Sequence, residues 1–240
     1  MTVPDSPGRR RLPRPRRAPA VLGIAVLGGV LAACSTTVSG QPQASQIPQP
    51  VATGDNSELA RLLPNPSQFP SPYLAITLPP ETAGQAARDL DGILPGAQVD
   101  PGDCMPTPPV SDPAVSVGTD DSTRATLTVE LVRTDQTLSA VEQQAQRCGS
   151  VRVTQSGTTA TVTTEVLPPP PLDADETVAL RRTVRSETGG PGLTRTMQTL
   201  LGQVGDVRIN VTYMSFGDDK PDGEALDSLF TTAVSKVRKG

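Results

Sequence analysis

The side chains of this sequence that offer chemistry are cysteines, acids, bases and hydroxyls, because histidine and tryptophan are absent. Without histidine, the usual Ser/His/Asp and Cys/His catalytic arrangements and most transition-metal sites are excluded. Asp120, Asp121, Asp173 and Asp175 lie in predicted turns, where Asp favours local hydrogen bonds. Paired carboxylates also serve hydrolases, but nothing in the sequence sets their separation. We predict no catalytic residue, no metal and no cofactor.

The segment 218–224 is similar to part of a calcium-binding loop. Asp218 and Asp222 hold the first and fifth places of such a loop, and Gly223 holds the sixth. The third place is Lys220 and the twelfth is Leu229, so required oxygen ligands are missing. An acidic helix N-terminus is the better interpretation.

Arg182 is the charged residue that we would test first for ligand binding. It shares the strand register of Val178, Leu180 and Val184, which places a guanidinium where an apolar side chain is expected. Together with two neighbouring arginines it is a speculative binding residue for a carboxylate or phosphate. A bulge, a strand end or an internal pair with Asp or Glu is the alternative.

Residues 1–33 have the three regions of a secretory signal peptide. Six arginines lie between Arg9 and Arg17, an uncharged run follows from Ala18 to Ala33, and small residues close it. The run is roughly 16 residues and contains three glycines, so it is too short to span a membrane comfortably. The pair Arg9-Arg10 leaves the export route open between the general and the twin-arginine pathways.

Cys34 ends the run Leu31-Ala32-Ala33-Cys34, which resembles the lipobox of bacterial lipoproteins. In that family the cysteine thiol is alkylated with diacylglycerol and becomes the first residue of the mature chain. Two or more acyl chains give stable membrane attachment. We therefore expect Cys34 to hold the protein on the extracytoplasmic face of the plasma membrane; the alternative is an ordinary cleaved signal with a chance cysteine.

The two remaining cysteines, Cys104 and Cys148, are an even number outside the cytoplasm, which favours a disulfide. Closing a loop of about 45 residues stabilises a fold by roughly 4 kcal/mol on the chain-entropy model. A redox-active pair is the alternative, although no Cys-x-x-Cys spacing supports it.

Charge argues against a polyanionic partner. Six of the 21 basic residues and one of the 25 acidic residues lie within 1–33, which leaves 15 basic and 24 acidic residues and a net charge near −9. Nucleic acid and anionic lipid surfaces both favour clustered Lys and Arg. We predict no nucleic-acid partner.

The chain divides by composition into three parts: the signal, a tether at 34–57 and a single domain at 58–240. The tether is rich in Ser, Thr, Gln and Pro and has no apolar period, so it cannot bury enough surface to order itself.

Within the domain, apolar residues at helical spacing predict helices at 58–63, 81–94, 138–148 after the cap Thr137, and 224–238. Alternation of apolar and polar residues, together with turn signals, predicts strands at 74–78, 125–132, 151–155, 158–167, 177–185, 193–201 and 207–216. Successive hairpins imply an antiparallel meander with one polar, threonine-rich face. We predict an α+β fold with helices packed on one face of the sheet, including the C-terminal amphipathic helix.

Several long stretches carry a resemblance to a known family. They are LLPNPSQFPSPY, VDPGDC, VGTDDSTRATLTVELVR, PPPPLDADETVALRRTVRS and GQVGDVRINVTYMSF, with the later Cys148 and the closing helix. The domain resembles the DUF5642-type lipoproteins of mycobacteria and related actinobacteria. It is more remotely similar to the extracellular sensor domains of PknH-type receptor kinases, which implies an α+β domain with a cleft for a ligand.

These observations favour a membrane-anchored binding or sensor-like module of the cell envelope, whose partner is a small molecule, an envelope polymer or a protein. We do not expect an enzyme. An envelope hydrolase that uses carboxylates is the alternative from another class, and a lipid carrier with a large apolar cavity is the third.

Overall fold

All seven predicted strands are present among the described residues, together with two that were not predicted. The computed structural model describes residues 55–107, 111–170, 174, 176–189, 194–217 and 220–240. They belong to one unit, Gln49–Gly240. The signal, Cys34 and the tether before residue 55 lie outside the described residues, as do Asp173, Asp175 and Asp218.

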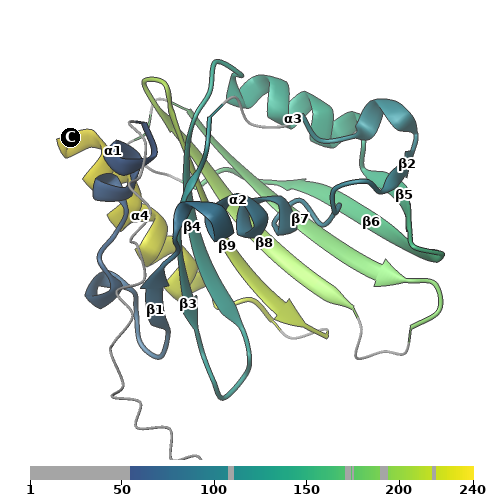
Figure 1. The fold of residues 1–240 in the computed structure, drawn as a ribbon, viewed down its shortest axis with the longest axis horizontal. Coiled ribbons are helices and arrows are strands. Elements are labelled where there is room, and N and C mark those ends of the chain that lie inside the picture. The colour runs from purple at the N-terminus through teal and green to yellow at the C-terminus, as the bar shows by residue number, and fades with distance from the viewer. Residues whose placement is uncertain (1–54, 108–110, 171–173, 175, 190–193, 218–219) are drawn as a thin grey trace, which may run out of the picture. The chain divides into compact units, whose positions relative to one another are not determined.

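All described strands form one antiparallel sheet in the order β1-β3-β4-β9-β8-β7-β6-β5-β2. Strands β5 to β9 run as consecutive hairpins, and the β3–β4 hairpin joins them through β4 (Figure 1). Two short strands, β1 and β2, form the edges. The bounds are β1 Leu74–Thr77, β2 Gln98–Asp100, β3 Ala114–Thr119, β4 Thr126–Arg133, β5 Ser150–Gln155, β6 Thr158–Leu167, β7 Glu176–Ser186, β8 Arg195–Val204 and β9 Val207–Phe216.

Four α-helices and two 3₁₀ turns complete the described part of the chain. They are α1 Asp55–Leu62, α2 Pro80–Asp89, α3 Leu138–Arg147 and α4 Gly223–Lys239, with η1 Pro66–Gln68 and η2 Gly102–Cys104. In this part of the chain, no helix combines the length and the apolar character that crossing a membrane requires.

Helix α4 covers one face of the sheet with the apolar stripe that its sequence predicts. Asp222 starts the helix, because its Oδ1 accepts a hydrogen bond from the backbone N–H of Ala225 at 3.1 Å. Gly202 on β8 lets the helix approach closely, since a Cβ there would lie 3.1 Å from Cζ of Phe230. The core on this face includes Val129, Ile209 and Val211 from the sheet and Leu226, Leu229, Phe230 and Ala233 from α4.

The α+β class, the antiparallel sheet and the C-terminal helix are confirmed, but the helices lie on both faces of the sheet instead of one (Figure 1). Helix α1 packs into the α4 core. Helix α2 packs Ala83 and Ala87 against Val115 of β3. Helix α3 packs Leu138 and Ala145 against apolar residues of β7 and β8.

The reason is that the sheet face opposite α4, which we call the second face, is not uniformly polar. Val115 pairs with Glu130, which alternates along β4 with Val129 and Leu131 of the α4 core. Val115 therefore faces away from α4, and so do the apolar residues under α3. These apolar patches near the two sides of the second face each hold a helix.

One predicted helix also ends earlier, and two strands were not predicted. The helix predicted at 81–94 ends at Asp89, because Gly92 takes a φ of +73° that a helix does not allow. Strand β3 was not predicted, since most of its residues are buried on both faces and show no clear alternation. Strand β2 has only three residues, too few for a periodic signal.

The predicted disulfide between Cys104 and Cys148 is present, with an S–S distance of 2.02 Å. It ties the turn η2 to the residue that caps the C-terminal end of α3. The bond therefore joins two segments that both cover the second face of the sheet.

Candidate functional site

A strip of polar residues lies on the second face of the sheet, between α2 and α3. Helix α2 lies on β3, and α3 lies on β6 to β8, so neither helix covers β4 and β9. Glu130 of β4 pairs with Asn210 of β9, and Thr199 of β8 pairs with Thr212 of β9, which places all four on one face. We call these residues, with Arg208, the polar floor.

A cavity of about 1080 Å³ lies above the polar floor. Leu90, Ile93 and Leu94, at and after the end of α2, form one wall. The disulfide, with the loop after η2, and α3 form the other walls. Leu94 and Met105 line the cavity although they are 41% and 44% exposed, so its outer part is apolar while its floor is polar.

Glu130 is a buried carboxyl group in the floor, only 7% exposed. Burial raises the pKa of Glu130 to about 7, because the charged form loses its hydration. A hydrogen bond from Nδ2 of Asn210 to its Oε2, at 2.7 Å, acts in the opposite direction. Asp91 raises the pKa further, whereas Arg208 and Arg182 lower it. Carboxyl groups perturbed in this way inside a cavity are typical of functional sites.

Arg208 brings a positive charge into the same floor, and it is 5% exposed. Its Nε donates to Oε1 of Gln203 at 2.8 Å, and its Nη2 donates to the backbone carbonyl of Gln136. Burial lowers the pKa of Arg208, and Glu130 and Glu176 oppose this effect. The guanidinium therefore fastens the loop between β4 and α3 to the floor.

Arg182, the predicted ligand-binding residue, lines the cavity on β7. Its Nη1 donates to the carbonyl of Leu90 at 3.3 Å and lies 3.7 Å from Oδ1 of Asp91. The internal pair with an Asp, which was the alternative interpretation, is therefore present in the cavity wall. The neighbouring Arg181 alternates to the other face, where it pairs with Glu165, so the arginines do not form one cluster.

A pair of hydroxyl groups and one amide group complete the polar floor. The hydroxyl groups of Thr199 and Thr212 bond each other at 3.0 Å. Oδ1 of Asn210 is buried and has no hydrogen-bond partner among the described residues. A buried acceptor without a donor is rare in folded proteins and calls for an explanation.

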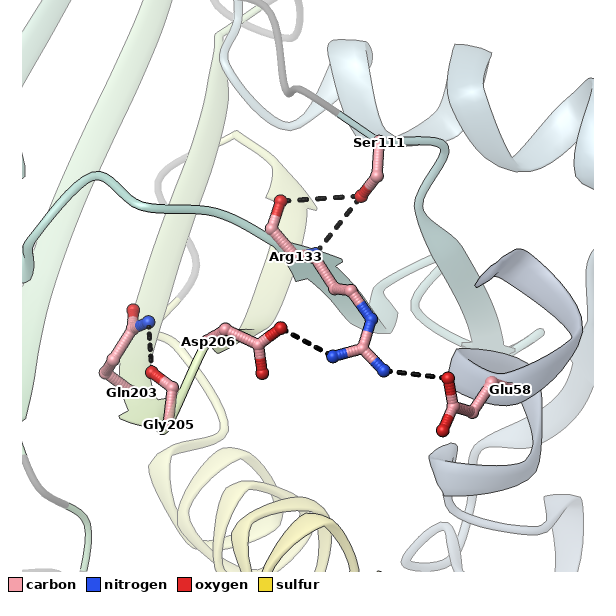
Figure 2. Close-up of polar contacts among 6 residues, drawn as sticks. All are labelled: Glu58, Ser111, Arg133, Gln203, Gly205 and Asp206. Atoms are coloured by element: carbon pink, nitrogen blue, oxygen red, sulfur yellow. Dashed lines mark hydrogen bonds and ion pairs between the residues drawn. The ribbon is translucent and has the colours of Figure 1, made fainter. Parts of the chain in front are cut away.

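Arg133, the last residue of β4, makes polar contacts with three other segments (Figure 2). Its Nη1 donates to Oδ2 of Asp206 at 2.6 Å, and its Nη2 donates to Oε2 of Glu58 at 2.8 Å, so it links the β8–β9 turn to α1. Oγ of Ser111, a cavity residue, accepts from the backbone N–H of Arg133 at 3.2 Å and donates to its carbonyl at 3.4 Å. Both acids are well exposed, so these pairs orient the segments more than they stabilise them.

The other sequence candidates have local roles. Asp120 accepts from the hydroxyls of Ser122 and Thr123, at 2.7 and 2.6 Å, which lowers its pKa and confirms the predicted turn. Asp222 caps α4 and accepts from the hydroxyl of Tyr73 at 3.3 Å. Within the described ranges, no group of three or more Cys, Asp or Glu residues is placed to hold a metal ion.

Sequence reasoning missed Glu130, Arg208 and Asn210, because alternation marked them only as the solvent side of their strands. No signal within β4 or β9 shows what covers that side of the sheet.

No protein-family model matches the chain, and no curated protein matches it. The resemblance to the DUF5642-type lipoproteins therefore stays a prediction. Among solved structures, the chain is similar to the extracellular domain of PknH from Mycobacterium tuberculosis, with a TM-score of 0.49 and 17% sequence identity. The similarity covers 78% of this chain and 98% of that chain.

Proposed function

We propose that this protein is a ligand-binding module of the cell envelope, held at the plasma membrane through a lipid on Cys34. The domain captures a small amphipathic molecule in the cavity between α2 and α3. The signal peptide, the Leu-Ala-Ala-Cys sequence and the composition of the tether support the location. The cavity supports the activity.

The single observation that carries the proposal is the cavity of about 1080 Å³ with buried polar groups in its floor. Ligand pockets in proteins are concave, mostly apolar and equipped with a few placed polar groups. Burying Glu130 opposes folding, since a buried charged group loses its hydration, and a role in binding accounts for this cost.

The polar floor also bears on the lipid-carrier alternative. A cavity that encloses whole acyl chains requires an apolar lining throughout, whereas Glu130, Arg208 and Asn210 line this one. These residues favour a ligand with a polar group that reaches the sheet and an apolar part near Leu94 and Met105.

The test is a panel of envelope lipids, glycans and peptidoglycan fragments, followed by thermal unfolding of the purified domain. A true ligand at a hundredfold excess over its Kd stabilises the folded state by about 2.7 kcal/mol. Native mass spectrometry of protein isolated from its own envelope identifies a molecule that copurifies.

Val141→Trp, on the cavity side of α3, fills the site and is expected to abolish both the thermal shift and the copurified mass. Gln143→Trp, on the exposed side of the same helix, is the matched control and is expected to leave both unchanged. If no member of the panel shifts unfolding and nothing copurifies, the proposal is wrong.

A specific observation also favours a second candidate, a hydrolase that uses two carboxyl groups. Asp91 and Glu130 line the same cavity, and Glu130 has a pKa raised to about 7, as a general acid requires. This candidate predicts turnover of a glycan or ester that both Asp91→Asn and Glu130→Gln abolish. Binding without turnover would favour the first candidate.

A further inference from the structure

We infer that the ligand of this cavity carries a cationic amine, which takes its place beside Glu130 and Asn210 on the polar floor. The inference rests on the proposed function and names the chemical class of its ligand. It follows from which buried groups lack a partner.

Glu130 is the carboxyl group of the polar floor, and it forms no ion pair with another described residue. Within the described ranges, no Lys or Arg nitrogen lies within 4.0 Å of its carboxylate. Arg182 lies beside Asp91, and the guanidinium of Arg208 is held by Gln203 and Gln136. A buried carboxylate is costly without a paired charge, so a bound cation is the stabilising complement.

Asn210 adds a second acceptor at the same place. Its Nδ2 donates to Glu130, and its Oδ1 is buried with no donor in the part of the chain that the structure describes. An ammonium group offers three N–H donors and no acceptor, so one group can serve both the carboxylate and the amide oxygen. An anionic head group would instead bring further acceptors to a place that already has too many.

The other residues that line the cavity indicate the chemistry of the ligand beyond its amine. The charged residues that line the cavity are Arg88, Arg182 and Arg208 against Asp91, Asp112, Glu130 and Asp135. Once Glu130 is ionised, the acids exceed the bases by one, which favours a cation over an anion. Leu94 and Met105, exposed at the outer part, suit an apolar chain attached to the amine.

Binding of an ammonium group favours the ionised form of Glu130, so it releases a proton when Glu130 is protonated beforehand. Its pKa of about 7 makes this release measurable near neutral pH. The charged groups that face Glu130 are Asp91 from the segment after α2, Arg182 from β7 and Arg208 from β9. Helix α3 contributes only uncharged residues to the lining.

The experiment uses three probes with the same apolar chain and different heads: decylamine, decanol and decanoate. Isothermal titration calorimetry of the purified domain, below the micelle-forming concentration of each probe, measures their affinities. We expect decylamine to bind at least about tenfold more tightly than decanol, as a buried charge-assisted hydrogen bond provides. The titrations are repeated in two buffers of different ionisation enthalpy near neutral pH. The difference between the two binding heats should show proton release for decylamine alone.

Glu130→Gln is expected to remove the preference for decylamine while decanol binding persists. The matched control is Glu165→Gln, an exposed glutamate on β6 whose side chain pairs with Arg181 on the other face. It should keep the preference. The proton-release measurement needs no variant, so it stands even if Glu130→Gln folds poorly.

Equal binding of decylamine and decanol, or tighter binding of decanoate, would overturn the amine inference and leave the proposed cavity function standing. Retention of the preference by a folded Glu130→Gln variant would overturn it as well. If none of the three probes binds, the amine inference is overturned, and the panel described above then decides separately whether the cavity binds any other ligand.

Discussion

At the scale of single residues, Glu130 and Arg208 show how β-strands can present buried charged groups without any motif. Both occupy ordinary alternating positions, yet they are 7% and 5% exposed because they lie at the bottom of a cavity whose walls shield them. Arg208 satisfies its guanidinium with Gln203 and Gln136, whereas Glu130 has one hydrogen bond from Asn210. This incomplete partnering of Glu130 is the basis of the proposed ligand contact.

The raised pKa of Glu130 predicts a pH-dependent stability. The folded state holds the proton up to a pKa of about 7, whereas a free carboxyl loses it near 4.5, so the folded state binds more protons between these values. The stability that the protonated form provides is complete below about pH 4.5 and is lost as the pH rises through about 7. The size of the loss is on the order of 3 kcal/mol.

Glu130→Gln removes this dependence, because the amide stays neutral. We expect the variant to gain stability relative to the parent by about 3 kcal/mol between about pH 4 and pH 8, measured by urea unfolding. Comparing the two proteins at each pH cancels the titration of all other groups. A constant difference across this range would show that Glu130 does not titrate as described.

At the scale of elements, the cavity follows from the width of the sheet. Nine strands at about 4.8 Å spacing span roughly 40 Å, whereas a helix is about 10 Å across. The ten-residue helices α2 and α3 therefore cannot cover the second face between them. The strands left uncovered, β4 and β9, carry the polar floor.

The disulfide between Cys104 and Cys148 holds η2 and the end of α3 together at the cavity wall. We expect the double variant Cys104→Ser and Cys148→Ser to lose roughly 2–5 kcal/mol of stability, because the crosslink closes a loop of about 45 residues. Ligand affinity should fall too, since η2 and α3 would no longer be joined at the cavity wall. Urea unfolding and calorimetry measure both effects.

Reduction of the parent protein with dithiothreitol should reproduce the behaviour of the double variant. A variant as stable as the parent, with unchanged affinity, would mean that packing alone holds the wall.

At the scale of the whole molecule, the proposed arrangement is an acidic domain on a polar tether from an acylated cysteine. The net charge near −9 after residue 33 disfavours contact with anionic surfaces, so the proposed attachment relies on the lipid. The cavity belongs entirely to the unit Gln49–Gly240.

Cys34→Ser is expected to prevent acylation and to move the protein from the membrane fraction to the aqueous fraction. Mass spectrometry of the N-terminal peptide should show a fatty-acylated Cys34 in the parent protein and none in the variant. The variant lacking Cys104 and Cys148 is the control, because it keeps the anchor and should stay with the membrane. A parent protein with an intact Met1 and no acyl group would refute the anchor.

The local sequence was sufficient for the elements whose signal lies within one segment. The stripe of α4, the cap at Thr137, the alternation of β4 and β9 and the hairpin of β5 and β6 are all confirmed, since each depends on neighbours a few residues apart. The pairing of Cys104 with Cys148 was also predictable, because only two cysteines remained after Cys34.

Only the tertiary structure decided which face each helix covers, and with it the site. Whether Glu130 meets water or a cavity depends on where α2 and α3 pack, and both helices pack on strands other than β4. The alternation of apolar and polar residues along a strand shows that a side chain points away from one core. It does not show what lies on the opposite face of the sheet. Arg182 could be suspected from its own strand, whereas its partner Asp91, 91 positions earlier in the sequence, became evident only when the chain was folded.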